Sequence, residues 1–144
     1  MLTTDEMLRV LAALEAAWTG DTPALESLAA ASPGEKPLQA AIADYADMAL
    51  QTLLAAAHGI HNGLSADQLD DAVTRMRTDT GTRMAKLLAQ TLRLWAKRPA
   101  DLQTIDDMAH VLISALLVLT VDDDQENVLP LLAQLRAGAL ASGT

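Results

Sequence analysis

Cysteine and phenylalanine are absent from this 144-residue chain, and only two Trp and one Tyr supply aromatic rings. Without cysteine, the chain forms no disulfide and offers no thiol nucleophile and no Cys-ligated zinc or iron–sulfur site. The shortage of rings disfavours stacking platforms for nucleic-acid bases and aromatic cages for cations. Recognition by this chain is therefore expected to use aliphatic and charged side chains.

Positive charge is also scarce, because ten Lys and Arg face nineteen Asp and Glu, a formal net charge of −9. Binding to nucleic acid or to anionic membranes depends on Lys and Arg, so we expect no general nucleic-acid binding. The N-terminus is acidic where a secretory signal is basic. The longest apolar run, 111–121, is shorter than the roughly 20 residues of a membrane span. We therefore expect a cytoplasmic protein with no membrane span.

Alanine and leucine dominate what is present, with 28 Ala and 26 Leu in a chain that is 51% hydrophobic. This apolar content is enough to offset the entropy of folding, and its residue types favour helices over strands, which prefer β-branched and aromatic residues. The length suits one domain, and no linker or internal repeat divides residues 1–144. We predict an all-α, single-domain, irregular or orthogonal bundle of six to seven helices.

Turn and capping residues mark the ends of these helices. Capping boxes are predicted at Thr3 and Ser65, each followed three residues later by Glu or Gln. The segment at about 102–121 is apolar on nearly every side, which is typical of a helix at the centre of a bundle. A last helix is expected to begin at Pro130, after an acidic turn or cap at 122–124.

The fifth predicted helix, about 82–98, follows Gly81, which is expected to break the chain. One face of this helix is apolar and is predicted to point into the core: Met84, Leu88, Leu92 and Trp95. Residues 75–98 also hold seven of the ten basic residues and one acid, about +6, which leaves −15 elsewhere. Four bases form a strip roughly opposite the apolar face: Arg83, Lys86, Arg93 and Lys97. The strip is either a solvated face or a docking site for an acidic protein, including a second copy of this chain.

The sixth predicted helix carries a polar strip on an otherwise apolar surface. Asp106 and Asp107 precede His110 by four and three residues, so either carboxylate can lie beside the imidazole. Burial of this pair would favour ligand binding or catalysis, because buried polar groups are costly, and exposure would favour a plain interaction protein. The candidate ligand-pocket residues are Tyr45, Trp95, Asp106, Asp107, Met108 and His110.

The sequence contains few residues that could bind a metal ion. Asp44 and Asp47 lie on one side of the third predicted helix, and His58 and His61 have H-x-x-H spacing. Metal sites in helical bundles use paired glutamate motifs, and the five Glu of this chain form none. We therefore assign no catalytic residue and expect no metal and no cofactor.

Three functions remain open at this point. The first is a non-enzymatic helical protein-interaction or scaffold module, expected to be a homodimer because small residues allow close helix approach and the charge is segregated. The second is a small-molecule-binding or sensing regulatory domain with a pocket near His110. The third is a metal-dependent hydrolase that would use Asp44, Asp47 and the histidines.

Overall fold

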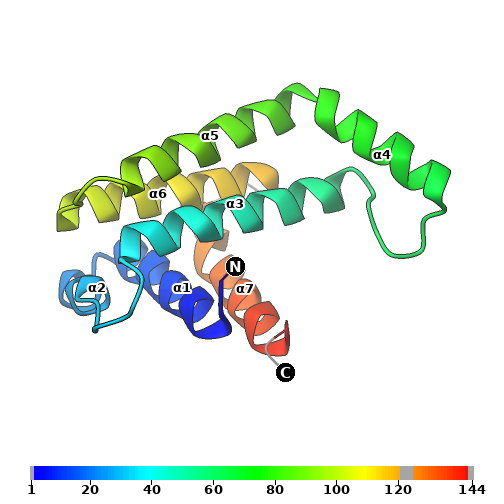
Figure 1. The fold of residues 1–144 in the computed structure, drawn as a ribbon. Coiled ribbons are helices and arrows are strands. Elements are labelled where there is room, and N and C mark those ends of the chain that lie inside the picture. The colour runs from blue at the N-terminus through cyan, green and yellow to red at the C-terminus, as the bar shows by residue number, and fades with distance from the viewer. Residues whose placement is uncertain (1, 121–124, 143–144) are drawn as a thin grey trace.

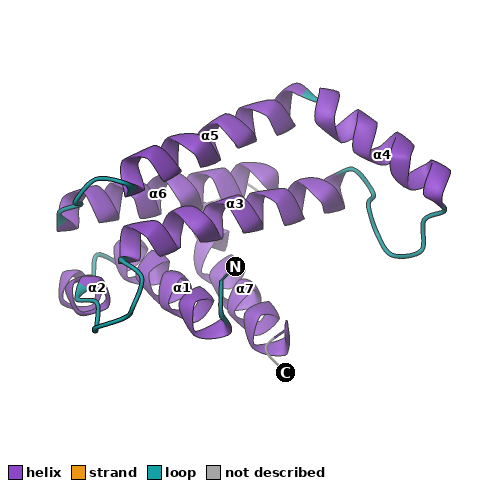
Figure 2. Cartoon of the chain, viewed as in Figure 1, coloured by secondary structure: helices purple, strands orange, loops and turns teal. Residues whose placement is uncertain are grey.

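The computed structural model describes residues 2–120 and 125–142, and within these ranges the chain forms helices and no strand (Figures 1 and 2). In chain order the elements are α1 (Thr4–Thr19), α2 (Thr22–Ala29), α3 (Leu38–Ala57), α4 (Ala66–Thr78), α5 (Thr80–Ala96), α6 (Leu102–Leu119), the 3-10 helix η1 (Gln125–Asn127) and α7 (Val128–Ser142). The prediction of an all-α bundle of six to seven helices is confirmed. The acidic turn predicted at 122–124 lies outside the described residues.

The helices form two layers that cross each other (Figure 1). In one layer α5 runs antiparallel to α3 and α6, and in the other α1 lies antiparallel to α7, with α2 beside α1. α6 contacts α1, α2 and α3, the central position predicted for the apolar segment, and α3 shares the centre because it contacts α1, α4, α5 and α6. α4 projects from one end of this body (Figure 1).

Small side chains make this packing close. Alanine and leucine form most of the core, and Ala41 and Ala46 of α3 are fully buried, as are Ala13 of α1 and Ala109 of α6. The distance between packed helices depends on the side chains at their contact, so alanine lets the backbones approach. Tyr45 is the one aromatic residue in the described core.

The inward face of α5 differs from the predicted one. Thr82, Ala89 and Leu92 are buried, whereas Met84 is 61% exposed and Trp95 is 44% exposed. The prediction for Met84 and Trp95 is therefore wrong. The physical reason is that α5 packs on α3 and buries the neighbouring face, which carries Thr82, Ala89 and Leu92, and this contact leaves Met84 and Trp95 outside.

Capping chemistry decides where several helices begin. Both predicted capping boxes, at Thr3 and Ser65, are present with reciprocal hydrogen bonds. The break between α4 and α5 falls at Asp79, two residues before the predicted glycine, because its carboxylate accepts a hydrogen bond from the Thr82 N–H at 3.0 Å. Pro130 is the third residue of α7, not the first, and still lies in the turn whose N–H groups lack intrahelical acceptors.

α6 is the one described helix that is long and apolar enough to cross a membrane, judged by length and composition alone. Its buried residues pack against α1, α2 and α3. Core helices of globular proteins satisfy the same two criteria.

Arg9 ties α1 to the connection between α2 and α3. Its guanidinium donates two hydrogen bonds to the carbonyl of Leu28, at 3.2 and 2.8 Å, and one to the carbonyl of Lys36, at 2.6 Å. The side chain is only 13% exposed, and the Glu35 carboxylate lies 3.7 Å away. A single side chain thus satisfies one carbonyl in the last turn of α2 and one in the loop that follows, and it fixes the position of α2 on α1.

Arg9→Ala is expected to lower the free energy of unfolding by roughly 1.5–3 kcal/mol, the usual worth of hydrogen bonds made by a charged group. Urea denaturation measures this loss. Arg136→Ala is the matched control, because the pair between Arg136 and Glu15 spans 2.9 Å but both side chains are nearly half exposed. Such surface pairs contribute about 0–1 kcal/mol, so equal losses in the two variants would contradict the role given to Arg9.

Candidate functional site

An apolar groove lies between α5 and α6. Both helices pack on α3, and the space left between them has a volume of about 610 Å³. Leu50 of α3 contributes to the lining, and the walls carry mainly aliphatic side chains: Met84, Ala85 and Leu88 of α5 and Val111, Ala115 and Val118 of α6. Such a groove suits the apolar face of another protein element or an apolar ligand.

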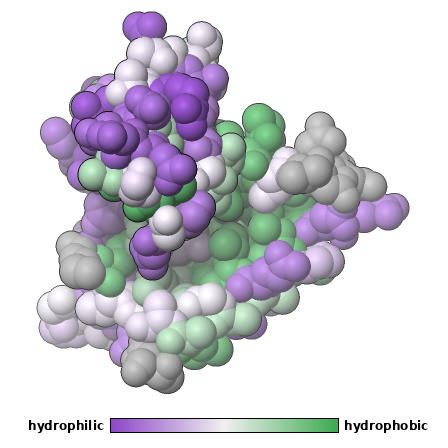
Figure 3. All heavy atoms as spheres, turned by 90° about the vertical axis from the view of Figure 1, so that its right-hand side faces the viewer, coloured by the Kyte–Doolittle hydropathy of each residue, from purple (hydrophilic) through white to green (hydrophobic). Residues whose placement is uncertain are grey.

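Large hydrophobic residues are exposed along the rim of this groove and on the outer side of α5. Their exposed fractions are 74% for Val118, 61% for Met84, 60% for Leu94, 56% for Leu87 and 44% for Trp95. Viewed from the end where α4 projects, the hydrophobic surface is recessed beneath a largely hydrophilic projection (Figure 3). Contiguous apolar surface of this kind marks interaction sites on proteins.

His110 lies at the edge of the groove and is held by its own helix. Its Nδ1 lies 2.9 Å from the carbonyl oxygen of Asp106 and 3.5 Å from a carboxylate oxygen of the same residue. The ring also faces Trp18, with centroids 6.1 Å apart. The side chain of His110 is 43% exposed and that of Asp106 is 33% exposed. Asp107 is exposed and accepts a hydrogen bond from Gln103 at 2.9 Å, so water reaches the whole strip.

The structure does not bring the six candidate pocket residues together. Only His110 lines the groove. Met108 is fully buried in the core, and Tyr45 lines a different cavity, between α1, α3 and α7. Trp95 and Asp107 line a smaller hollow near the connection of α5 to α6. The separation arises because α3 turns Tyr45 toward α1 and α7, away from the groove.

The basic strip of α5 is exposed along its whole length. Arg93 binds the acidic side of α3, with its Nη2 3.2 Å from Asp47 and 3.5 Å from Asp44. The other three bases make no ion pair with any residue that the structure describes: Arg83, Lys86 and Lys97. Within the strip, Arg93 therefore links α5 to α3, and the other three bases are exposed to solvent and could contact a partner.

The residues that a metal-dependent hydrolase would use have other partners. Asp44 accepts a hydrogen bond from Lys36 Nζ at 2.6 Å, which raises the pKa of the Lys36 ammonium group. His58 Nε2 lies 3.9 Å from the Asp79 carboxylate, whereas His61 Nδ1 accepts a hydrogen bond from the Gly63 N–H. Among residues 2–120 and 125–142, no three His, Asp or Glu side chains come together in a group that could hold a metal ion.

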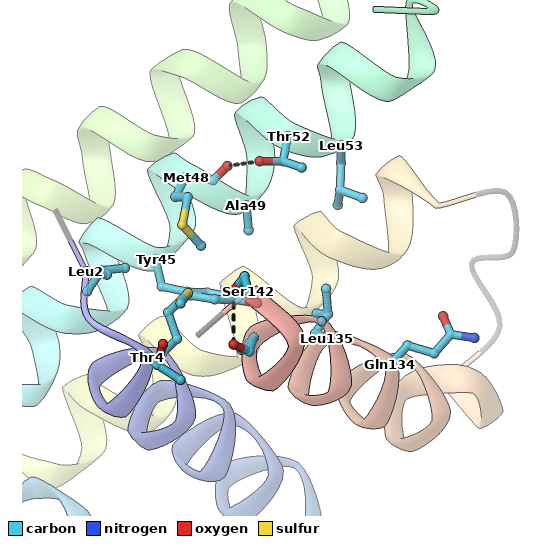
Figure 4. A pocket seen from close by; sticks show the side chains of 13 residues that line it. Leu2, Thr4, Tyr45, Met48, Ala49, Thr52, Leu53, Gln134, Leu135 and Ser142 are labelled. Atoms are coloured by element: carbon cyan, nitrogen blue, oxygen red, sulfur yellow. Dashed lines mark hydrogen bonds between the residues drawn. The ribbon is translucent and has the colours of Figure 1, made fainter. Parts of the chain in front are cut away.

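A second cavity, with a volume of about 560 Å³, lies between α1, α3 and α7 (Figure 4). Tyr45 extends across it from α3 toward the last turn of α7, near Ser142 (Figure 4). The residue is only 3% exposed, and burial raises the pKa of its hydroxyl to about 12. At neutral pH this hydroxyl is therefore a neutral hydrogen-bond donor inside an apolar enclosure.

Comparison of the chain with protein-family models, with curated proteins and with solved structures gives no match. The function is therefore inferred from the geometry of the described residues.

Sequence reasoning missed the outer apolar residues of α5 and α6, above all Val118, Leu87 and Leu94. A signal for them was present in the sequence. The apolar residues of α5 lie on two neighbouring sides of the helix, one with Met84 and Trp95 and one with Leu87 and Leu94. A helix that packs on the core with one side buries only one stripe of residues. An apolar surface as broad as that of α5 therefore indicates contact with a second partner.

Ionisation of Tyr45 is expected to lower the stability of the fold at alkaline pH. The hydroxyl of an unfolded Tyr has a pKa of about 10, so the unfolded chain loses this proton before the folded chain does. Because the buried phenolate is disfavoured, the folded state is unaffected by Tyr45 ionisation below pH 10 and loses about 3 kcal/mol of stability as the pH rises to about 12. Urea denaturation at stepped alkaline pH should show this fall in the native chain and not in Tyr45→Phe. An equal fall in both would contradict the assignment to Tyr45.

Proposed function

We propose that this protein is a non-enzymatic helical interaction module that self-associates as a homodimer through the α5–α6 groove. The observation that carries the proposal is the exposure of Val118, at 74% the most exposed large hydrophobic residue, beside an apolar groove on the same face. Exposed apolar surface of this extent is stabilised when a partner removes it from water.

The face has the form that a two-fold interface requires. In a symmetric dimer one surface meets itself, so it must carry both projecting groups and a recess that receives them. Val118 projects from α6 and Met84 projects from α5, and both also border the groove between these helices. A second copy related by a two-fold axis can therefore insert the same residues in return.

The order of charges along α4 and α5 favours a second copy as the occupant. These helices are exposed and change from acidic to basic along the chain: Asp67, Asp70 and Asp71 precede Arg75, Arg77, Arg83 and Lys86. A two-fold axis that pairs these helices antiparallel brings the acidic start of one α4 toward the basic α5 of the other copy. Opposite charges placed in this way favour association and fix its orientation.

The polar strip on α6 supports an interaction surface over a catalytic pair. His110 and Asp106 contact each other within one helix and are partly exposed, and Asp107 is held by Gln103. These groups are satisfied locally, and His110 lies at the edge of the groove. They suit the polar rim that surrounds the apolar centre of a protein interface.

Val118→Asp is expected to convert the dimer to a monomer, weakening association at least about tenfold, because an unpaired carboxylate would have to be buried at the interface. Sedimentation velocity across a concentration series measures this change. The fold should persist, since Val118 is mostly exposed in the monomer. Leu140→Asp on α7 is the matched control, an apolar residue 50% exposed on another helix, and it should leave the dimer intact. A native chain that stays monomeric throughout would refute the proposal.

Arg83→Glu is expected to weaken the dimer by roughly threefold to tenfold at low salt, because it removes an attractive charge and adds a repulsive one. The difference from the native chain should shrink as added salt screens the charges. Arg136→Glu reverses a charge on α7 and serves as the control. The same loss of affinity in both variants would indicate a net-charge effect, which contradicts a specific contact by Arg83.

A further inference from the structure

We propose that the cavity between α1, α3 and α7 binds a small, uncharged, mainly aliphatic molecule that carries one hydrogen-bond acceptor, which the Tyr45 hydroxyl recognises. The site is separate from the α5–α6 groove, and the proposal does not depend on self-association. Its volume of about 560 Å³ lies within the range of roughly 300–1,000 Å³ that is usual for small-molecule sites.

The lining of the cavity excludes a charged ligand. Its apolar residues come from all three helices and the segment before α1: Leu2, Met7, Met48, Leu53 and Leu135. None of the side chains that line it within the described part of the chain is charged. An ion that entered would lose its water without gaining a counter-charge, which is strongly unfavourable. The ligand class that fits is therefore neutral and mostly hydrocarbon.

The Tyr45 hydroxyl is the group that points to a ligand with an acceptor. Tyr45 is 97% buried, since its exposed fraction is 3%, and its hydroxyl makes no hydrogen bond to any residue in the described part of the chain. The side chain extends across the cavity (Figure 4). No side-chain N or O atom of the described residues is both fully buried and unbonded, so the Tyr45 oxygen reaches the open space of the cavity, where the acceptor of a ligand can replace water.

Two neighbouring hydroxyls, of Thr52 and Ser142, donate hydrogen bonds within their own helices. Thr52 donates to the carbonyl of Met48 at 2.9 Å, and Ser142 donates to the carbonyl of Ala139 at 3.0 Å (Figure 4). These bonds lie within single helices. Thr4 and Gln134 also line the cavity, but Thr4 is half-buried and Gln134 is exposed, so the Tyr45 hydroxyl is the most deeply buried donor that a ligand can meet. One deep donor in a mainly aliphatic lining favours an aliphatic molecule with one acceptor.

Two features of the wall keep the cavity open and adaptable. Met7 and Met48 have flexible, unbranched side chains that can adjust to the shape of a ligand. Gly138 lies on the wall within α7, where a Cβ would meet no atom within 4 Å. Glycine inside a helix costs about 1 kcal/mol relative to alanine, so its presence here exchanges helix stability for open space beside the cavity.

Three eight-carbon probes test the chemistry: methyl octanoate, which is neutral and has an acceptor; octanoate, which is charged; and octane, which has no acceptor. Ligand-observed NMR with the full chain at neutral pH gives their relative affinities. We expect methyl octanoate to bind at least about tenfold more tightly than octanoate, because the charge is not compensated in the cavity. Octanoate binding as tightly as the ester, or no binding of the ester, would overturn the proposal.

Two variants test whether the ligand binds in this cavity. Tyr45→Phe keeps the ring that fills the core and removes only the hydroxyl, so methyl octanoate should bind about threefold to tenfold more weakly while octane is unaffected. Gly138→Leu adds a side chain to the wall and improves helix propensity, so it should abolish binding of every probe in a chain that stays folded.

Met84→Ser, in the α5–α6 groove, is the matched control and should leave all three affinities unchanged. Loss of binding in this variant would place the ligand in the groove and refute the assignment to the α1–α3–α7 cavity. Retention of full binding by Gly138→Leu, or an equal effect of Tyr45→Phe on octane and on the ester, would refute it as well.

Discussion

Close packing of the other helices on α3 is the constraint on which the rest of this structure depends. α1, α5 and α6 all contact α3, and Ala41, Ala43 and Ala46 are at most 1% exposed. Alanine at these contacts lets the helix backbones approach closely. α5 turns Thr82, Ala89 and Leu92 inward, so its other bulky residues lie outside, and Met84 borders the groove to α6. The surface proposed for self-association is thus a direct result of how the core is packed.

Local features of the fold could be predicted from the sequence, because they depend on residues close together in the chain. The capping boxes at Thr3 and Ser65 need only a side chain and a backbone N–H three residues apart. The orientation of α5 could not be predicted in this way. Its largest residues indicated one inward face, but the helix is turned by about a quarter of its circumference, because the face with Thr82, Ala89 and Leu92 packs inward.

Which residues come together in the candidate sites could not be predicted from the sequence, for a related reason. Tyr45 and His110 both lie on helices with a strong apolar pattern, which indicates that a side chain faces inward but not which helix it will meet. The same holds for Arg9, whose acceptors Leu28 and Lys36 lie 19 and 27 residues away in the chain. The partners of these side chains depend on how the helices pack on one another, which no local sequence pattern encodes.

The projection of α4 from the body has a consequence for the dynamics of the chain. Of its thirteen residues only Ala72 is buried, so α4 is stabilised mainly by its capping box and by the basic residues in its last turn. A helix with so little buried surface opens at a much smaller free energy than helices that share the core. Backbone amides of α4 therefore exchange with solvent through local opening while α1, α3 and α6 remain folded, and the chain has two levels of stability.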